Sequence, residues 1–134
     1  MFTLLACILC VNSPNVELER TIDVMIQVES GGNWNAVGDN GKSIGGLQIS
    51  RAYWLDGTRF LGVQWPYNDA RDPAKARAVV RAYLLHWQRA GQFPQTPEVF
   101  ARLHNGGPTG PLKACTKPYW HRIQACLSAA SRCR

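Results

Sequence analysis

The sequence contains little of what a membrane, fibrous or nucleic-acid-binding protein needs. No apolar run reaches the roughly 18 residues that a membrane-spanning helix requires, so stable membrane insertion is not expected. Its 12 Gly and 8 Pro residues follow no period, which excludes a collagen-like or low-complexity architecture. No run of Lys or Arg exceeds two residues, and no basic stripe alternates with aromatic residues, so nucleic-acid binding is not expected either.

Candidate metal ligands are also sparse. The three histidines, His86, His104 and His121, do not cluster with carboxylates at ligand spacing. Cys7 and Cys10 form a Cys-x-x-Cys pair, but no nearby His or second Cys pair completes a zinc site. We therefore expect neither a metal nor a cofactor.

What remains is the composition of one globular domain. The chain has 134 residues, of which 46% are apolar and only 18% charged, and we expect residues 14–134 to fold as one monomeric domain. Lys and Arg outnumber Asp and Glu by 15 to 9, giving a net charge of +6. Such a charge attracts an anionic partner, including the bacterial cell wall, although it also serves solubility alone.

An apolar segment opens the chain. Residues 2–11 have the length of the apolar core of a secretory signal, and residues 1–13 are predicted to be removed on export. This predicts a secreted or periplasmic protein. No Lys or Arg precedes the segment, so a buried N-terminal strand or a start codon placed too late stays open as the alternative.

The last three cysteines, Cys115, Cys126 and Cys133, lie within the final twenty residues. In an oxidising compartment we expect one disulfide among them, with the pairing left open.

Periodicity and turn signals predict several helices around one small hairpin, an α+β domain in which helix dominates. The hairpin is centred on the turn at residues 38–41, Gly-Asp-Asn-Gly. An irregular loop is expected at residues 56–71, where Gly, Pro and Asn recur. Helices are expected at residues 17–29, 50–55, 72–90, from 96 to the break at 105–108, and 118–130.

Glu29 is the most informative single position. It lies 3, 4, 7 and 11 residues after Ile26, Met25, Ile22 and Leu18, so it shares their apolar helix face. A carboxyl group there is partly desolvated, which favours its neutral form and suits a general acid. The alternative is a solvated glutamate at a helix end.

Asp39 follows ten residues later at the tip of the predicted hairpin. Its surroundings are polar, so we expect it to stay ionised, although ordinary turn chemistry also explains an Asp there. An uncharged and a charged carboxyl group together form the unlike pair that glycoside hydrolysis uses. Asp56, Asp69 and Asp72 compete for the second role, but Asp72 is better explained as a helix cap.

Several motifs then resemble the invertebrate-type lysozymes, the destabilase-like family, from about residue 22 to 125. The most specific are His-Asn-Gly-Gly-Pro at 104–108 and Tyr-Trp-x-Asp-Gly at 53–57. The match also includes residues 29–32 (Glu-Ser-Gly-Gly), 45–49 (Gly-Gly-Leu-Gln-Ile) and 119–120 (Tyr-Trp). The family is usually dense in disulfides, so this chain resembles a cysteine-poor, divergent member.

The resemblance implies a lysozyme-like fold and cleavage of the β-1,4 bond between N-acetylmuramic acid and N-acetylglucosamine in peptidoglycan. Glu29 matches the family's acid and Asp39 its second carboxylate. We expect the sugar cleft to be lined by Gln48, Tyr53, Trp54, His104 and Asn105. Core packing is the alternative for Tyr53 and Trp54. A carboxyl separation of about 5–5.5 Å would imply retention, the outcome we expect, and about 6.5–9.5 Å inversion.

Two other functions stay open. A lytic transglycosylase would act on peptidoglycan through the single Glu29 and release an anhydro sugar. A non-catalytic cell-wall-binding domain would keep the fold without chemistry. The same catalytic residues acting on chitin also remain an option.

Overall fold

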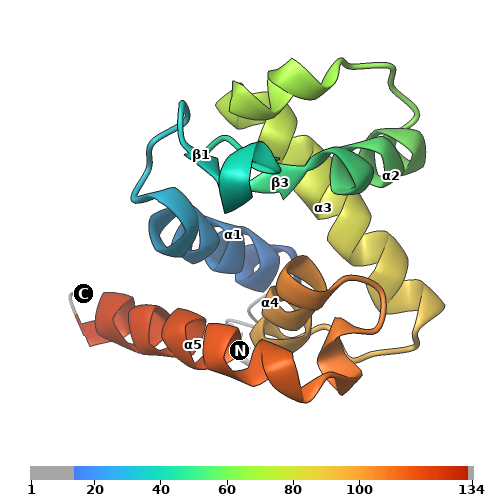
Figure 1. The fold of residues 1–134 in the computed structure, drawn as a ribbon. Helices are drawn as coiled ribbons and strands as arrows, with labels where there is room; N and C mark the ends of the chain where they lie inside the picture. Colours follow the sequence, from blue (N-terminus) through green and yellow to red (C-terminus); the bar gives the residue numbers. More distant parts are fainter. Residues whose placement is uncertain (1–13, 133–134) are drawn as a thin grey trace, which may run out of the picture.

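The computed structural model describes residues 14–132 and confirms an α+β fold dominated by helix (Figure 1). The small sheet lies on one side of α1, and α5 packs along α1 as well. The α-helices are α1 (Pro14–Ser30), α2 (Arg51–Leu61), α3 (Pro73–Ala90), α4 (Pro97–Gly106) and α5 (Lys117–Arg132). The strands are β1 (Val37–Gly38), β2 (Ser43–Ile44) and β3 (Ile49–Ser50), and the 3-10 turns are η1 (Asp39–Gly41), η2 (Tyr67–Arg71), η3 (Gly110–Leu112) and η4 (Ala114–Thr116).

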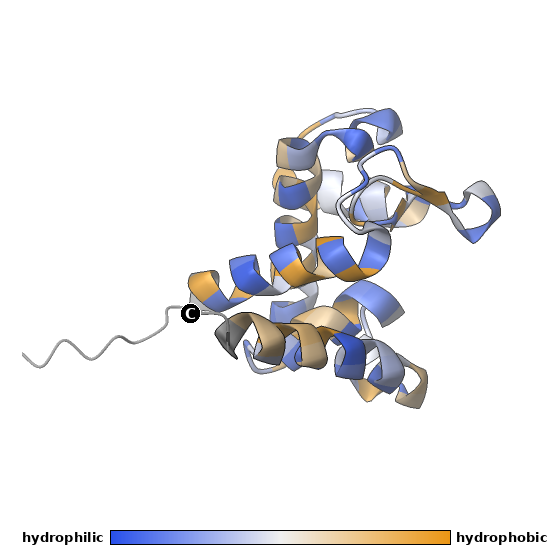
Figure 2. Cartoon of the chain, turned by 90° about the vertical axis from the view of Figure 1, so that its left-hand side faces the viewer, coloured by the Kyte–Doolittle hydropathy of each residue, from blue (hydrophilic) through white to orange (hydrophobic). Residues whose placement is uncertain are grey.

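Helix α1 is anchored on two sides. Its residues Leu18, Ile22 and Met25 are fully buried, as their spacing predicts. Its polar side faces α3, where Arg77 and Arg81 donate to the Glu19 carboxylate at 2.8 and 2.6 Å. Figure 2 shows the resulting alternation of hydrophobic and hydrophilic stretches along the helices. The buried apolar side and the ion pairs with α3 together fix the position of α1.

The predicted hairpin is present and belongs to a slightly larger sheet. Strand β2 pairs antiparallel with β1 and also with β3, a third strand that the hairpin pattern does not predict. In this register Ser43 lies opposite both Gly38 and Ser50. Because strand side chains alternate between faces, Ser43 and Ser50 share one face of the sheet.

The prediction of an irregular loop at residues 56–71 is wrong for residues 56–61, which belong to α2, and for residues 67–71, which form η2, and it holds for residues 63–66 between them. Helix α2 begins after its cap, Ser50, whose hydroxyl accepts from the Tyr53 amide at 3.3 Å, and continues to Leu61. Gly57 lies inside it, where a Cβ would approach the Val79 Cγ1 atom of α3 to 2.5 Å. Glycine here permits close helix packing rather than a break.

The starts of α3 and α4 follow the predicted caps. The Asp72 carboxylate accepts from the Lys75 amide at 2.9 Å, and the Thr96 hydroxyl accepts from the Val99 amide at 3.3 Å. Each cap is followed by a proline in the first helical turn. One hydrophobic core joins these helices with α1, α2 and α5.

Some of the sequence predictions concern residues outside the range 14–132. The predicted signal segment, residues 1–13, lies outside the described residues, as do Cys7, Cys10 and Cys133. Cys115 and Cys126 are both exposed free thiols, so a disulfide between these two is not formed. Within residues 14–132, no helix combines the length and apolar character needed to span a bilayer.

Candidate active site

A small polar cavity of about 220 Å³ lies where α1, the sheet, α2 and α4 meet. It brings together residues that are up to 76 positions apart in the chain, including both predicted catalytic carboxyl groups. Its lining comprises Glu29, Asp39, Ser43, Gln48, Ser50, Tyr53, His104 and Asn105. Of the seven predicted site residues, only Trp54 is not among them.

Glu29 stands in the last turn of α1 and is half-buried. The next residue fixes this helix end, because the Ser30 hydroxyl donates to the Gly46 carbonyl at 2.8 Å. Gly46 in turn packs so closely on Trp34 that a Cβ would lie 2.7 Å from the indole ring. The Glu-Ser-Gly motif thus attaches the carboxyl-bearing end of the helix to the turn between β2 and β3.

Asp39 is exposed at the hairpin tip and is held by a hydroxyl group. Its backbone adopts a left-handed conformation, with φ of 52°, as does Asn40 with φ of 56°. Asp and Asn tolerate this region better than most residues. The Ser43 hydroxyl donates to the Asp39 carboxylate at 2.8 Å, which orients the charged group.

Gln48 lies in the turn between β2 and β3, also with a left-handed backbone, φ of 50°. Its amide nitrogen donates to the Gly45 carbonyl at 2.9 Å and the Ala36 carbonyl at 3.3 Å. A Cβ on Gly38 would lie only 2.1 Å from the Gln48 amide oxygen, so this side chain fits only because residue 38 is glycine. A residue held by its side chain in a strained backbone conformation is typical of a functional site.

Tyr53 and His104 form a hydrogen-bonded pair across the cavity. The Tyr53 hydroxyl lies 2.9 Å from His104 Nδ1, and His104 Nε2 lies 3.1 Å from the Leu47 carbonyl. A carbonyl only accepts, so Nε2 carries the proton and Nδ1 accepts from the tyrosine. Burial lowers the pKa of His104, against the opposing effects of Glu29 and the Leu47 bond, and favours this neutral ring.

Tyr53 itself is mostly a core residue. Burial, together with Tyr83, Tyr119 and Glu29, raises its pKa well above the usual range, so the phenol keeps its proton. Its ring stacks on Tyr83 with centroids 3.6 Å apart. The side chain therefore forms the rigid floor of the cavity.

The prediction that Trp54 lines the sugar cleft is wrong. Its side chain is only 2% exposed, and its indole nitrogen donates to the Trp65 carbonyl at 2.9 Å. Trp54 follows Tyr53 directly on α2, and adjacent helix residues point about 100° apart. The ring therefore packs into the core, the alternative that its position left open.

Sequence reasoning missed Ser43 and Ser50. Both line the cavity, and both lie on the same face of the β2–β3 pair. Recognising residues 49–50 as a third strand would have placed them there. The three competing acids have other roles: Asp72 is a helix cap, Asp56 pairs with Arg59 at 3.2 Å, and Asp69 pairs with Lys75 at 2.9 Å.

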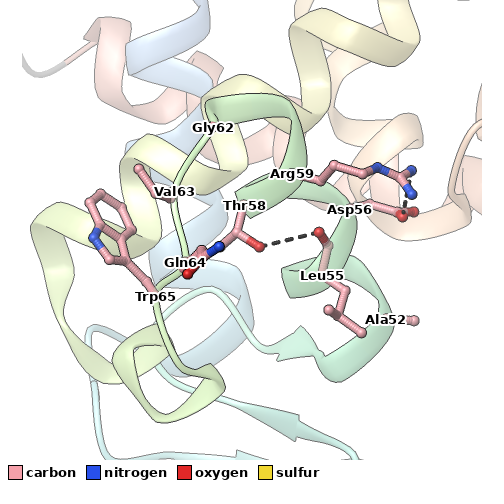
Figure 3. Close-up of a pocket in the computed structure, with 9 residues that line it drawn as sticks. All are labelled: Ala52, Leu55, Asp56, Thr58, Arg59, Gly62, Val63, Gln64 and Trp65. Atoms are coloured by element: carbon pink, nitrogen blue, oxygen red, sulfur yellow. Dashed lines mark hydrogen bonds and ion pairs between the residues drawn. The ribbon is translucent and has the colours of Figure 1, made fainter.

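A larger cavity of about 780 Å³ lies at the far end of α2 and in the segment after it (Figure 3). Of the described residues that line it, Asp56 alone is acidic, and that carboxylate is turned to Arg59. The remaining lining is mostly apolar, with Leu55, Val63 and Trp65 among its side chains. Its chemistry does not match a two-carboxyl site, so the smaller cavity is the better candidate.

The smaller cavity therefore offers two unlike carboxyl groups from different elements. One is half-buried beside a neutral imidazole, and the other is exposed and held by a hydroxyl group. Such a pair can donate a proton on one side of a bound sugar and stabilise positive charge on the other. Among residues 14–132, no group of three or more His, Cys, Asp and Glu side chains is arranged to hold a metal ion.

Comparison with known proteins agrees with this chemistry. The family described as Destabilase matches residues 19–126. "Lysozyme" of Meretrix lusoria is 36% identical over 108 residues, which cover 79% of this chain and 87% of that protein. "Lysozyme 1" of Crassostrea virginica is 40% identical over 86 residues, 64% of this chain but only 46% of that longer protein.

Solved structures show the same fold. The crystal structure of Tapes japonica lysozyme superimposes with a TM-score of 0.70 at 29% identity, covering 79% of this chain and 87% of that one. The Meretrix lusoria lysozyme, in complex with Aeromonas hydrophila PliI, gives a TM-score of 0.68 at 32% identity, covering 80% and 88%.

Proposed function

Since this chain belongs to the destabilase family of invertebrate-type lysozymes, we propose that it is a bacteriolytic glycoside hydrolase acting on peptidoglycan. It cleaves the β-1,4 bond between N-acetylmuramic acid and N-acetylglucosamine. The observation that carries this proposal is the cavity in which Glu29 and Asp39, from a helix end and a hairpin tip, face a common space.

The mechanism assigns one step to each carboxyl group. Glu29 transfers its proton to the glycosidic oxygen as the bond from that oxygen to the anomeric carbon breaks. Asp39 faces the resulting oxocarbenium-like carbon and bonds to it or stabilises its charge. A water molecule then attacks this carbon from the face that the leaving group vacated, breaking any bond to Asp39 and releasing its carboxylate, and gives a proton to Glu29. This restores the acid and retains the anomeric configuration.

The polar rim of the cavity supplies sugar recognition. Asn105 carries an amide group that suits the N-acetyl and hydroxyl groups of the substrate. Gln48 uses its amide nitrogen on the Ala36 and Gly45 carbonyls and offers the substrate its amide oxygen as an acceptor. The polar atoms of Tyr53 and His104 are taken up by the bond between them and by the bond from His104 to the Leu47 carbonyl, so these two side chains shape the floor of the cleft.

A turbidity assay on purified peptidoglycan tests the two roles. We expect Glu29→Gln to lower the clearing rate by about 10²-fold or more, because a positioned general acid contributes about 10²–10⁴-fold. Asp39→Asn should also abolish most activity. Asp56→Asn is the matched control, since that carboxylate lies outside the cavity, and it should clear at the wild-type rate. Equal clearing by wild type and Glu29→Gln would contradict the assignment.

Product analysis separates the hydrolase from its rivals. A lytic transglycosylase would retain activity in Asp39→Asn and would yield an anhydro sugar detectable by mass spectrometry. A non-catalytic wall-binding domain would release no sugar from any variant while binding the wall equally well. We expect reducing sugar ends from the wild-type protein, with the anomeric configuration retained by NMR.

We further propose that the protein acts outside the cytoplasm as a monomer, with no nucleic-acid partner. The apolar N-terminal segment and the cell-wall substrate support export. N-terminal sequencing of the exported protein should find residues 1–13 removed, and sedimentation should give a mass near that of one chain. A mature N-terminus at Met1 would contradict the predicted signal.

A further inference from the structure

The Tyr119 hydroxyl is a buried polar group without an evident structural use. Tyr119 stands in the first turn of α5, and its side chain is only 3% exposed. Apart from Glu29, its hydroxyl has no hydrogen-bond partner among the residues that the structure describes. A buried hydroxyl whose one available partner is a carboxyl group of the candidate site points to a role in that site.

This hydroxyl faces Glu29. Burial raises the pKa of Tyr119 far above its usual range, and Glu29 raises it further through its charge and through a side-chain hydrogen bond. The phenol therefore keeps its proton under all working conditions and is available only as a hydrogen-bond donor. The other phenol beside Glu29, that of Tyr53, is already engaged with His104 Nδ1.

The Tyr119 ring is held in place on two sides. It lies against the His104 ring with centroids 6.3 Å apart, and the Arg122 guanidinium lies 5.5 Å from its centroid. Just before α5, the buried Thr116 hydroxyl accepts from Arg102 Nε at 2.8 Å, which ties this segment to α4. These contacts fix both the Tyr119 ring and the start of α5, so the Tyr119 hydroxyl is held in one position.

We propose that Tyr119 is a positioning residue for Glu29, an inference that rests on the proposed function. Its O–H donates a hydrogen bond to one oxygen of the Glu29 carboxyl group. The other carboxyl oxygen, which bears the catalytic proton, is thereby directed into the cleft. When that proton moves to the glycosidic oxygen, the same bond stabilises the new carboxylate, and Tyr119 retains its own proton throughout.

If Tyr119 positions Glu29, removing its hydroxyl should lower kcat while KM and the stability of the protein change little. The hydrogen bond strengthens as charge develops on Glu29, so its loss should act on kcat and leave KM unchanged. The folded protein should lose little stability, because the only bond lost is the one to Glu29, and water can reach that half-buried carboxyl group in its place. If the Tyr119 hydroxyl had only a structural role, its removal would lower the stability of the protein and leave kcat unchanged.

The experiment compares Tyr119→Phe with Tyr83→Phe on a soluble peptidoglycan fragment. Tyr83 is the matched control, since it is a buried tyrosine in the same aromatic group but does not line the cavity. We expect kcat to fall about ten-fold in Tyr119→Phe, with KM within two-fold of wild type and Tm little changed. Tyr83→Phe should keep the wild-type kcat.

Three outcomes would overturn the inference: a Tyr119→Phe kcat within two-fold of wild type, a rise in KM that accounts for the loss, or a clear fall in Tm. The proposed function is tested separately by including wild type and Glu29→Gln. If wild type cleaves and Glu29→Gln does not, an unchanged Tyr119→Phe rejects the positioning role alone. If wild type releases no sugar, the proposed function itself fails.

Discussion

At the scale of single residues, His104 shows how one neutral ring connects two parts of the molecule. From α4 it donates to the Leu47 carbonyl near the sheet and accepts from Tyr53 on α2. Protonation would add a hydrogen to Nδ1 and destroy its ability to accept. The geometry therefore requires an imidazole that stays uncharged.

This requirement predicts a dependence of stability on pH. Burial lowers the His104 pKa in the folded state, so the unfolded chain binds a proton there more readily. The stabilising contribution of His104 is therefore fully present above the unfolded pKa of about 6.5 and is lost as pH falls through the lowered folded value. We expect the Tm advantage of wild type over His104→Gln to shrink between pH 8 and pH 5.

The exposed His121 supplies the comparison. His121→Gln has no buried pair to lose, so its Tm difference from wild type should be the same at both pH values. A Tm advantage of His104 that does not change with pH would contradict the prediction.

At the scale of elements, the contact between α2 and α3 depends on the absence of a side chain. Gly57 on α2 lets Val79 of α3 approach so closely that a Cβ would lie 2.5 Å from Val79 Cγ1 and 3.0 Å from its carbonyl oxygen. Tyr53 and Trp54 lie on the same helix. The position of the cavity floor is thus set by this contact.

We predict that Gly57→Ala destabilises the protein by about 1–3 kcal/mol, the usual cost of overpacking. On helix propensity alone the same change would stabilise it by about 0.5–1 kcal/mol, so the sign of the effect is diagnostic. Urea unfolding measures it. Leu55→Ala, at a position 64% exposed on the same helix, should change stability by less than about 0.5 kcal/mol. A stabilised Gly57→Ala would refute the close packing.

At the scale of the whole molecule, the net charge of +6 suits an anionic polymer. Attraction of this kind acts over distances set by the Debye length, about 30 Å at 0.01 M salt and about 10 Å at 0.1 M. Raising the ionic strength should therefore weaken binding to the bacterial wall without affecting the chemistry in the cavity.

We predict that wall clearing slows several-fold between about 10 and about 200 mM salt, because the Debye length falls from about 30 Å to less than about 10 Å over this range. Hydrolysis of an uncharged soluble N-acetylglucosamine oligomer serves as the reference and should change less than about two-fold over the same range. A parallel decline on both substrates would show that salt acts on the enzyme instead of on its attraction to the wall.

Much of the local structure was already determined by the sequence. Asp72 and Thr96 begin their helices as predicted, because a cap satisfies backbone amides within three residues of itself. The hairpin at Asp39 and the burial of α1 followed from turn chemistry and helical spacing. Each of these depends on neighbours in sequence, and Glu29 and Asp39 are predicted as the catalytic pair by the same local reasoning together with the family motifs.

Only the tertiary structure decided which side chains share the cavity and which do not. Gly57 contributes to the prediction of an irregular loop, because the local pattern does not show its contact with Val79 of α3, 22 residues away. Trp54 and Tyr53 are adjacent in sequence and both belong to the core, yet only Tyr53 reaches the cavity. Tyr119 reaches Glu29 only through the packing of α5 on α1, a contact across 90 residues that no local pattern encodes.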